Sequence, residues 1–191
     1  MGPSQIDRVI GVFKAYTTRV GEGPFPTELN EDVGNHLLTV GREYGTTTGR
    51  ARRCGWFDGV IARYSVQVNG LDGLAITKLD VLDGLPEVKL CVAYRNTRTG
   101  EVYHHFPSRL TTLTHCEPVY ETWPGWTQPI TEARTIDELP AEARQYLNRL
   151  AEVAGCPLSI ISVGPDRNQT ILLEQPLSAG RRTATRLASS V

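Results

Sequence analysis

The chain has 191 residues, of which 40% are apolar and 21% charged, and its formal net charge is −1. This composition is typical of a globular domain, and the near-zero charge excludes a global attraction to nucleic acid or to a membrane surface. No apolar run is long enough for a transmembrane helix, and the N-terminus lacks the apolar stretch of a signal peptide. We therefore expect a cytoplasmic protein without nucleic-acid or membrane partners.

Cysteine and histidine spacing predicts no metal site in this chain. Cys54, Cys91, Cys116 and Cys156 contain no C-x-x-C pair, and we interpret them as separate thiols of a reducing compartment. The four histidines comprise one adjacent pair and two isolated residues, for which structural or surface roles are more frequent.

The first segment, residues 6–20, is rich in Val, Ile, Tyr and Thr and predicts one buried strand. Only five residues precede it, so we expect that natural N-terminal neighbours of this strand are missing. Glycines and prolines make residues 21–27 a loop, and residues 30–44 carry apolar side chains at helical spacing. Residues 57–68 also favour a helix, with Asn69-Gly70 as its C-terminal cap.

The second half of the chain continues this alternation. We expect a strand over 74–82, hairpin strands over 87–94 and 101–106, a helix from Pro140 to Gly155, and extended segments over 158–162 and 169–173. Residues 118–129 contain aromatic side chains broken by prolines, and we expect them to cover an edge of the core.

Together these elements predict an α/β fold: part of a mostly parallel central sheet flanked by helices, with an added β-hairpin. We expect residues 1–173 to form one domain. Residues 174–191 are small and polar, with few large apolar side chains, and predict a disordered tail.

The densest chemical signal is the arginine loop, residues 45–56, which reads G-T-T-T-G-R-A-R-R-C-G-W. Arg50, Arg52 and Arg53 follow three threonines and a glycine. Arginine forks match carboxylate and phosphate oxygens, while hydroxyls and free backbone N–H groups can line an anion site. The loop is therefore predicted to hold a small anion, with a solvated basic turn as an equal alternative for such a cluster taken alone.

Two further loops follow strand ends. Thr77-Lys78-Leu79-Asp80 resembles the [N/T]-K-x-D element of GTP-binding proteins, where the carboxylate accepts from two donors of guanine and the lysine stem lies along the base. Ser162-Val163-Gly164-Pro165 is a glycine turn whose backbone can complete a base pocket. Taken alone, a surface Lys–Asp pair and an ordinary turn are the commoner meanings of these two patterns.

Four motifs in a fixed order carry a family resemblance. They are G-P-F-P-T-E-L at 23–29, T-T-G-R-A-R-R-C-G-W at 47–56, N-G-L-D-G-L-A-I-T-K-L-D-V-L-D-G-L at 69–85 and S-V-G-P-D-R at 162–167. The stretch from about residue 6 to about residue 171 resembles the C-terminal portion of adenylosuccinate synthetase. The resemblance implies a homodimeric, magnesium-requiring ligase of the AMP branch of purine biosynthesis. In that reaction GTP phosphorylates the 6-oxygen of IMP, and the amine of L-aspartate then displaces the phosphate.

The resemblance also implies roles for individual residues. The aspartate substrate would be held by Thr46, Thr47, Thr48, Gly49, Arg50, Ala51 and Arg52. IMP would contact Val20, Gly21 and Arg50. GTP would contact Arg52, Lys78, Leu79, Asp80, Ser162, Val163 and Gly164. Ala51 departs from the family pattern, which usually has proline or a basic residue there.

Several parts of the family pattern are absent from this sequence. They are the glycine-rich phosphate loop G-D-E-G-K-G, the catalytic aspartate and histidine, and with them the segment expected to bind Mg²⁺. We therefore expect that the isolated chain does not catalyse the full reaction. The main alternative is a non-catalytic module that binds a guanine nucleotide or a dicarboxylate. A third hypothesis, an RNA-binding domain, is disfavoured by the near-neutral charge.

Overall fold

The computed structural model describes residues 5–173, so the predicted tail over 174–191 lies outside the described residues. The elements are β1 (Ile10–Lys14), β2 (Thr17–Arg19), α1 (Asp32–Val40), β3 (Arg53–Gly55), β4 (Phe57–Asp58), α2 (Gly59–Asn69), β5 (Gly73–Thr77), η2 (Leu79–Leu82), β6 (Glu87–Asn96), β7 (Val102–Tyr103), α3 (Leu110–Leu113), β8 (Cys116–Pro124), η3 (Ile136–Glu138), α4 (Ala141–Ala154), β9 (Leu158–Ser162) and β10 (Thr170–Leu172). No helix among residues 5–173 combines the length and the apolar character needed to cross a membrane.

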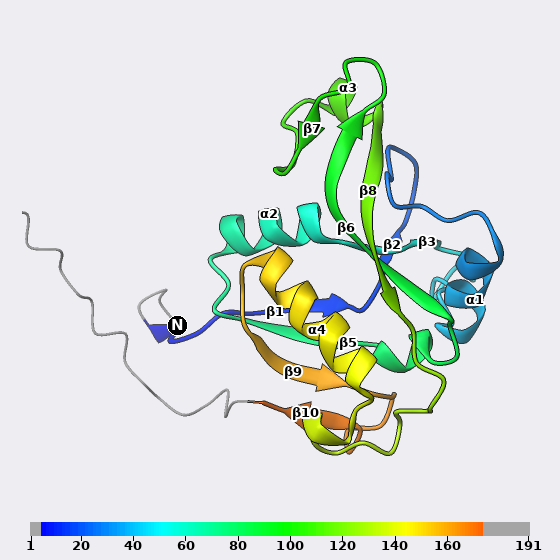
Figure 1. The fold of residues 1–191 in the computed structure, drawn as a ribbon, viewed down its shortest axis with the longest axis vertical. Coiled ribbons are helices and arrows are strands. Elements are labelled where there is room, and N and C mark those ends of the chain that lie inside the picture. The colour runs from blue at the N-terminus through cyan, green and yellow to red at the C-terminus, as the bar shows by residue number, and fades with distance from the viewer. Residues whose placement is uncertain (1–4, 174–191) are drawn as a thin grey trace, which may run out of the picture.

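The main sheet has the strand order β1-β5-β9-β10. β5 pairs in parallel with both β1 and β9, and β10 runs antiparallel to β9. Helices α2 and α4 pack against each other and lie over this sheet (Figure 1). The predicted α/β class with a mostly parallel sheet is therefore confirmed.

A second sheet is built around the long strand β6. Strand β4 pairs with it in parallel, whereas β7 and β8 pair antiparallel. The β6–β8 ribbon extends from the body of the molecule and carries β7 and α3 at its far end (Figure 1). The predicted hairpin is confirmed as β6 and β7.

The helices begin and end where local chemistry predicts. The Asp58 side chain accepts hydrogen bonds from the backbone N–H groups of Val60 and Ile61 at the start of α2. Gly70 and Gly155 close α2 and α4 in the left-handed conformation that glycine adopts without a Cβ clash. The predicted helices over 57–68 and 140–155 are thus confirmed, with α2 preceded by the two-residue strand β4.

Two strand predictions need correction. Residues 6–20 form two strands in different sheets, because the chain bends at the buried residues Ala15 and Tyr16 and β2 then pairs with β3. β1 is also not a buried strand: Val12 is 73% exposed, and among residues 5–173 β1 pairs only with β5. The strand predicted over 74–82 ends at Thr77, because Lys78 turns into a left-handed conformation and a 3₁₀ helix follows.

The prediction that residues 118–129 cover an edge of the core is confirmed, because Trp126 is buried in the main core cluster and Tyr120 and Trp123 pack against it. The part up to Pro124 belongs to strand β8, which pairs with β6 along its length. Proline lacks the N–H that a central strand must donate, but it is tolerated where the strand has an unpaired side. β8 meets this condition because β6 is its only strand partner in the described part of the chain.

Candidate functional site

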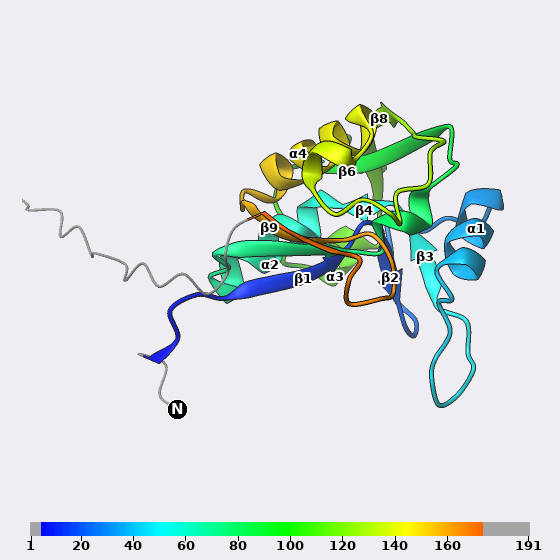
Figure 2. The same cartoon turned by 90° about the horizontal axis from the view of Figure 1, so that it is seen from below.

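The arginine loop is a hairpin-like excursion between α1 and β3. Tyr44 and Ala51 form an antiparallel bridge at its base, and Arg52 donates its backbone N–H to the carbonyl of Glu43 at 2.8 Å. Further along, Gly45 donates to the carbonyl of Arg50 and Gly49, with a positive φ of 64°, donates to that of Gly45. The loop extends away from the body of the molecule (Figure 2). Its tip, residues 46–50, is exposed to solvent.

A pocket of about 360 Å³ lies on this loop. Its lining consists of Val20, Gly45, Thr48, Arg50, Ala51 and Arg52. The structure thus brings Val20, from the end of the first segment, to the arginine loop as the resemblance implied. Two arginines and a threonine line this small pocket, and the donors that these residues carry suit an anion with two acceptor oxygens.

A second pocket, of about 310 Å³, lies where the strand ends of β5 and β9 meet the end of α1. Its lining consists of Val40, Gly41, Arg42, Lys78, Asp80, Val81, Gly164 and Pro165. The two weak loop motifs, one after β5 and one after β9, therefore line the same pocket. Burial raises the pKa of Asp80 above its usual value, while its own backbone N–H and Lys78 oppose the rise.

One buried carboxylate, that of Glu43, connects the two pockets. Glu43 is fully buried and accepts from Arg52 at 2.7 Å and from Lys78 at 3.1 Å. Lys14 donates to both of its oxygens at 2.8 Å, and the Tyr16 hydroxyl donates at 2.6 Å. Arg52 lines the first pocket and Lys78 the second. We call these five residues the Glu43 cluster.

The charges of the Glu43 cluster fix its protonation state. Burial alone raises the pKa of Glu43, but hydrogen bonds from Lys14, Tyr16, Arg52 and Lys78 outweigh it and bring the pKa down to about 2. The carboxylate is therefore ionised at neutral pH. Burial lowers the pKa of Lys14, against the effect of its hydrogen bond to Glu43.

The other predicted residues are placed less directly. The side chains of Leu79 and Val163 are buried in the core, so only their backbone groups can face a ligand. Ser162 donates its hydroxyl to the carbonyl of Gly164 at 2.9 Å, which fixes the turn rather than pointing a donor into the pocket. Thr46 and Thr47 are exposed and do not line the arginine-loop pocket. Gly21 has a φ of 80°, and a Cβ added there would meet no atom within 4 Å.

Arg53, the third arginine of the loop sequence, has a structural role. Its guanidinium donates to both carboxylate oxygens of Glu28, at 2.6 and 2.5 Å, and to the carbonyls of Gly21 and Gly23. It thereby holds the loop over residues 21–26, together with Arg19, which donates to the carbonyls of Glu22 and Pro24.

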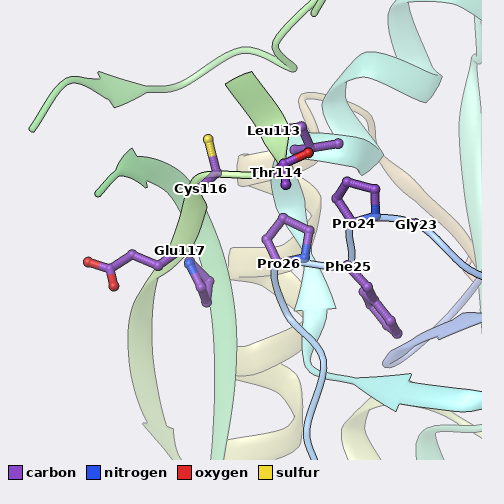
Figure 3. A pocket seen from close by; sticks show the side chains of 9 residues that line it. Gly23, Pro24, Phe25, Pro26, Leu113, Thr114, Cys116 and Glu117 are labelled. Atoms are coloured by element: carbon purple, nitrogen blue, oxygen red, sulfur yellow. The ribbon is translucent and has the colours of Figure 1, made fainter. Parts of the chain in front are cut away.

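A third pocket, of about 500 Å³, lies on the side of this loop that faces α3 and β8 (Figure 3). Its lining consists of Gly23, Pro24, Phe25, Pro26, Leu113, Thr114, Cys116, Glu117 and Pro118. The side chains shown there are mainly apolar, and the charged one is the carboxylate of Glu117 (Figure 3). This lining does not suit a phosphate or a dicarboxylate.

The structure also shows the state of the cysteines and whether the described side chains could bind a metal ion. Cys54, Cys91, Cys116 and Cys156 are free, which confirms the prediction of separate thiols. Over residues 5–173 no group of three or more His, Cys, Asp or Glu side chains is arranged to hold a metal ion.

Sequence reasoning missed Glu43, Lys14 and Tyr16, and it also missed Arg42 at the rim of the second pocket. One signal was available for Glu43: an acidic residue at the end of a helix, directly before an arginine-rich loop, is a candidate counter-charge. Nothing in the spacing of Lys14 and Tyr16 indicates that they meet it.

Comparison with known proteins decides the family. A family model described as adenylosuccinate synthetase matches residues 1–171. The chain belongs to the adenylosuccinate synthetase family. It is 62% identical over 173 residues to the adenylosuccinate synthetase of Desulforudis audaxviator, covering 91% of this chain and 40% of the relative. It is 58% identical over 182 residues to that of Picosynechococcus sp., covering 95% of this chain and 41% of the relative.

A solved structure supports the same assignment. The fully ligated adenylosuccinate synthetase from Plasmodium falciparum superposes with a TM-score of 0.87 at 43% identity, covering 91% of this chain and 42% of that one. The chain thus spans about two fifths of the length of the adenylosuccinate synthetases that it matches. The resemblance drawn from the four motifs is confirmed.

Proposed function

We propose that residues 5–173 form the guanine-nucleotide and dicarboxylate pockets of an adenylosuccinate synthetase, which ligates IMP and L-aspartate with GTP. The observation that carries this proposal is the Glu43 cluster. Its carboxylate holds Arg52 at one pocket and Lys78 at the other, so loops far apart in the sequence form one connected site.

The pocket of Lys78 and Asp80 is the guanine site in this proposal. Guanine presents N1–H and a 2-amino group side by side, and a carboxylate accepts both. Adenine has no N–H donors at these two positions, so Asp80 selects guanine over adenine. Lys78 lays its aliphatic stem along the base, and the Ser162–Gly164 turn, with Val163 and Leu79 contributing backbone, closes the pocket.

The arginine-loop pocket binds the other substrates. Arg50 and Arg52 each offer a fork to a carboxylate of L-aspartate, and Thr48 adds a hydroxyl. Thr46, Thr47, Gly49 and Ala51 form the remainder of the loop and contribute backbone groups or exposed hydroxyls.

IMP lies beside Val20, Gly21 and Arg50, where the loop over residues 21–26 is held by Arg53. The link from Arg52 through Glu43 to Lys78 supports a further contact of Arg52 with GTP.

In this proposal the residues of this chain bind and orient substrates. Phosphorylation of the 6-oxygen of IMP makes a leaving group, which the aspartate amine then displaces. Mg²⁺, when bound, neutralises charge on the phosphates. Because the described residues hold no suitable ligand group, we assign no metal-dependent step to them.

Isothermal titration of the 191-residue chain tests this function. GTP should bind at least about tenfold more tightly than ATP, because adenine leaves the Asp80 carboxylate unpaired. IMP with L-aspartate should give a separate binding heat, which Arg50→Ala removes while GTP binding persists. Arg98→Ala, at an exposed arginine of the β6–β7 loop, is the matched control and should change neither. Equal affinity for GTP and ATP, or no heat with any of these ligands, would contradict the proposal.

A further inference from the structure

The Glu43 cluster is larger than a single ion pair. Three cationic side chains and one phenol converge on a single carboxylate that is fully buried. We propose that Glu43 is a positioning residue that couples occupancy of the guanine pocket to occupancy of the arginine-loop pocket. The inference rests on the proposed function, because it takes the ligands of the two pockets to be a guanine nucleotide and IMP with L-aspartate.

At the first pocket, Glu43 orients the guanidinium of Arg52 and leaves most of its N–H donors available. Arg52 donates one Nη1 hydrogen bond to Glu43, and its side chain is 31% exposed on the pocket. A guanidinium has five N–H donors, so most of them stay available to a ligand. The bond to a buried, fixed carboxylate restricts the rotamers of Arg52 and so lowers the entropy that a ligand must remove.

At the second pocket, Glu43 holds a strained residue. Lys78 has a φ of 59° and a ψ of 34°, a left-handed conformation that is unfavourable for a residue other than glycine. Its ammonium donates to the carbonyl of Gly41 and to Glu43, which fixes the far end of the side chain. The aliphatic stem is thereby set at the pocket wall where a base can lie on it.

The coupling follows from the shared carboxylate. Lys78 and Tyr16 donate to one oxygen of Glu43, Arg52 donates to the other, and Lys14 spans both. A ligand that immobilises Arg52 also restricts the Glu43 carboxylate, so the ligand that next orders Lys78 has less disorder to remove. Linkage then requires the same factor in the opposite direction.

The test measures this factor in the 191-residue chain. The Kd for GDP is determined by isothermal titration with and without saturating IMP and L-aspartate. In the wild-type chain these ligands should tighten GDP binding by about fivefold or more. Glu43→Gln keeps the size of the side chain but removes its charge and turns one acceptor into a donor facing cationic N–H groups. In this variant the factor should fall to about one.

Two further carboxylate variants separate positioning from stability. Glu121→Gln breaks the Glu121–Arg149 pair, a bidentate ion pair that lies outside both pockets. It should lower the melting temperature and leave the coupling factor unchanged. Glu43→Asp retains the charge with a shorter reach and should recover part of the factor. An unchanged factor in Glu43→Gln would overturn the proposal.

Tyr16→Phe keeps the test decisive if Glu43→Gln does not fold. It deletes one hydrogen bond to Glu43 without touching either pocket and should reduce the coupling factor by about half. An unchanged factor in this variant would then overturn the proposal. If the wild-type chain binds no GDP at all, the proposed function fails together with the coupling. If it binds GDP tightly but the coupling factor is the same in the wild type and in the variant, only the coupling is overturned.

A spectroscopic measurement checks the positioning without any ligand. The chain has three lysines, at positions 14, 78 and 89. The ammonium protons of Lys14 and Lys78, detected through their ¹⁵N signals, should be protected from exchange with water in the wild-type chain. They should lose that protection in Glu43→Gln. Lys89, which pairs with Glu87 at 2.9 Å, should behave alike in both. Equal protection of Lys78 in the two proteins would contradict its orientation by Glu43.

Discussion

Replacing Asp58 by asparagine should stabilise the protein at neutral pH. Asp58 is 2% exposed, caps α2 through one carboxylate oxygen, and accepts from the Tyr94 hydroxyl at 2.5 Å through the other. Burial raises the pKa of Asp58 to about 6, from an ordinary value of 3.8, although hydrogen bonds from Tyr94 and the α2 backbone oppose the rise. An asparagine keeps an oxygen for the cap and an amide group beside Tyr94, but carries no charge.

The sign of the pH dependence follows from where the proton is bound. Below pH 3.8 the carboxyl is neutral in both the folded and the unfolded chain, and its contribution to stability is complete. Between 3.8 and about 6 the unfolded chain ionises while the folded chain holds its proton, so stability falls as the pH rises. A difference of about two pKa units corresponds to about 3 kcal/mol. Asp58→Asn should therefore match the wild type near pH 4 and exceed it by up to about 3 kcal/mol at pH 7.5.

Urea unfolding of both proteins at several pH values between 4 and 8 measures this difference. The exposed Asp137, which contacts Arg144 at 3.5 Å, provides the matched control Asp137→Asn, for which we expect a difference below about 0.5 kcal/mol throughout. A difference for Asp58→Asn that is independent of pH would refute the reasoning. A loss of stability in Asp58→Asn at pH 7.5 would also refute it. Such a loss would mean that the hydrogen bonds of the charged carboxylate stabilise the folded state by more than its desolvation destabilises it.

Three further predictions concern the site and the packing around it. Asp80→Asn should weaken GDP binding about tenfold or more and improve binding of xanthosine diphosphate, whose 2-oxo group accepts from the new amide; unchanged preference in titrations of both nucleotides would contradict the guanine assignment. Gly55→Ala should cost about 3 kcal/mol in urea unfolding, because an added Cβ would lie 2.1 Å from the backbone oxygen of Thr27, and a cost below about 0.5 kcal/mol would show that β3 can shift. The pKa of Glu43 is lowered from 4.5 to about 2, so its ionised carboxylate contributes fully to stability above pH 4.5 and this contribution is lost as the pH falls towards 2. Glu43→Gln should lack this acid-dependent loss of about 3 kcal/mol. Acid unfolding curves that run parallel for the wild type and the variant would be evidence against it.

Local chemistry made several elements predictable from the sequence. Helices α2 and α4 have an apolar stripe and a glycine directly after their last turn, and both signals act within a few residues of the chain. β5 and β9 are short apolar runs bounded by turns, as expected for strands buried between neighbours. The two loop motifs could be placed because each follows such a strand, and the ends of parallel strands meet at one edge of a sheet.

The failed predictions and the strand that was not predicted share a dependence on distant partners. Whether residues 6–20 continue as one strand depends on the burial of Tyr16 against Glu43, which is 27 positions away. Strand β8 contains two prolines and is recognisable only once its pairing with β6 and its free edge are known. Local propensity carries neither kind of information.

The same reasoning explains why the centre of the site was the hardest part to predict. Stability alone does not favour a buried carboxylate that faces three cations, since desolvation of the charges offsets much of their attraction. Nor does it favour a lysine in the left-handed region. Both features sit between two pockets whose linings include the motifs that carried the family resemblance. A local conflict with the rules of stability, maintained by a network of hydrogen bonds, is the expected signature of a site that must hold charged groups ready for a ligand.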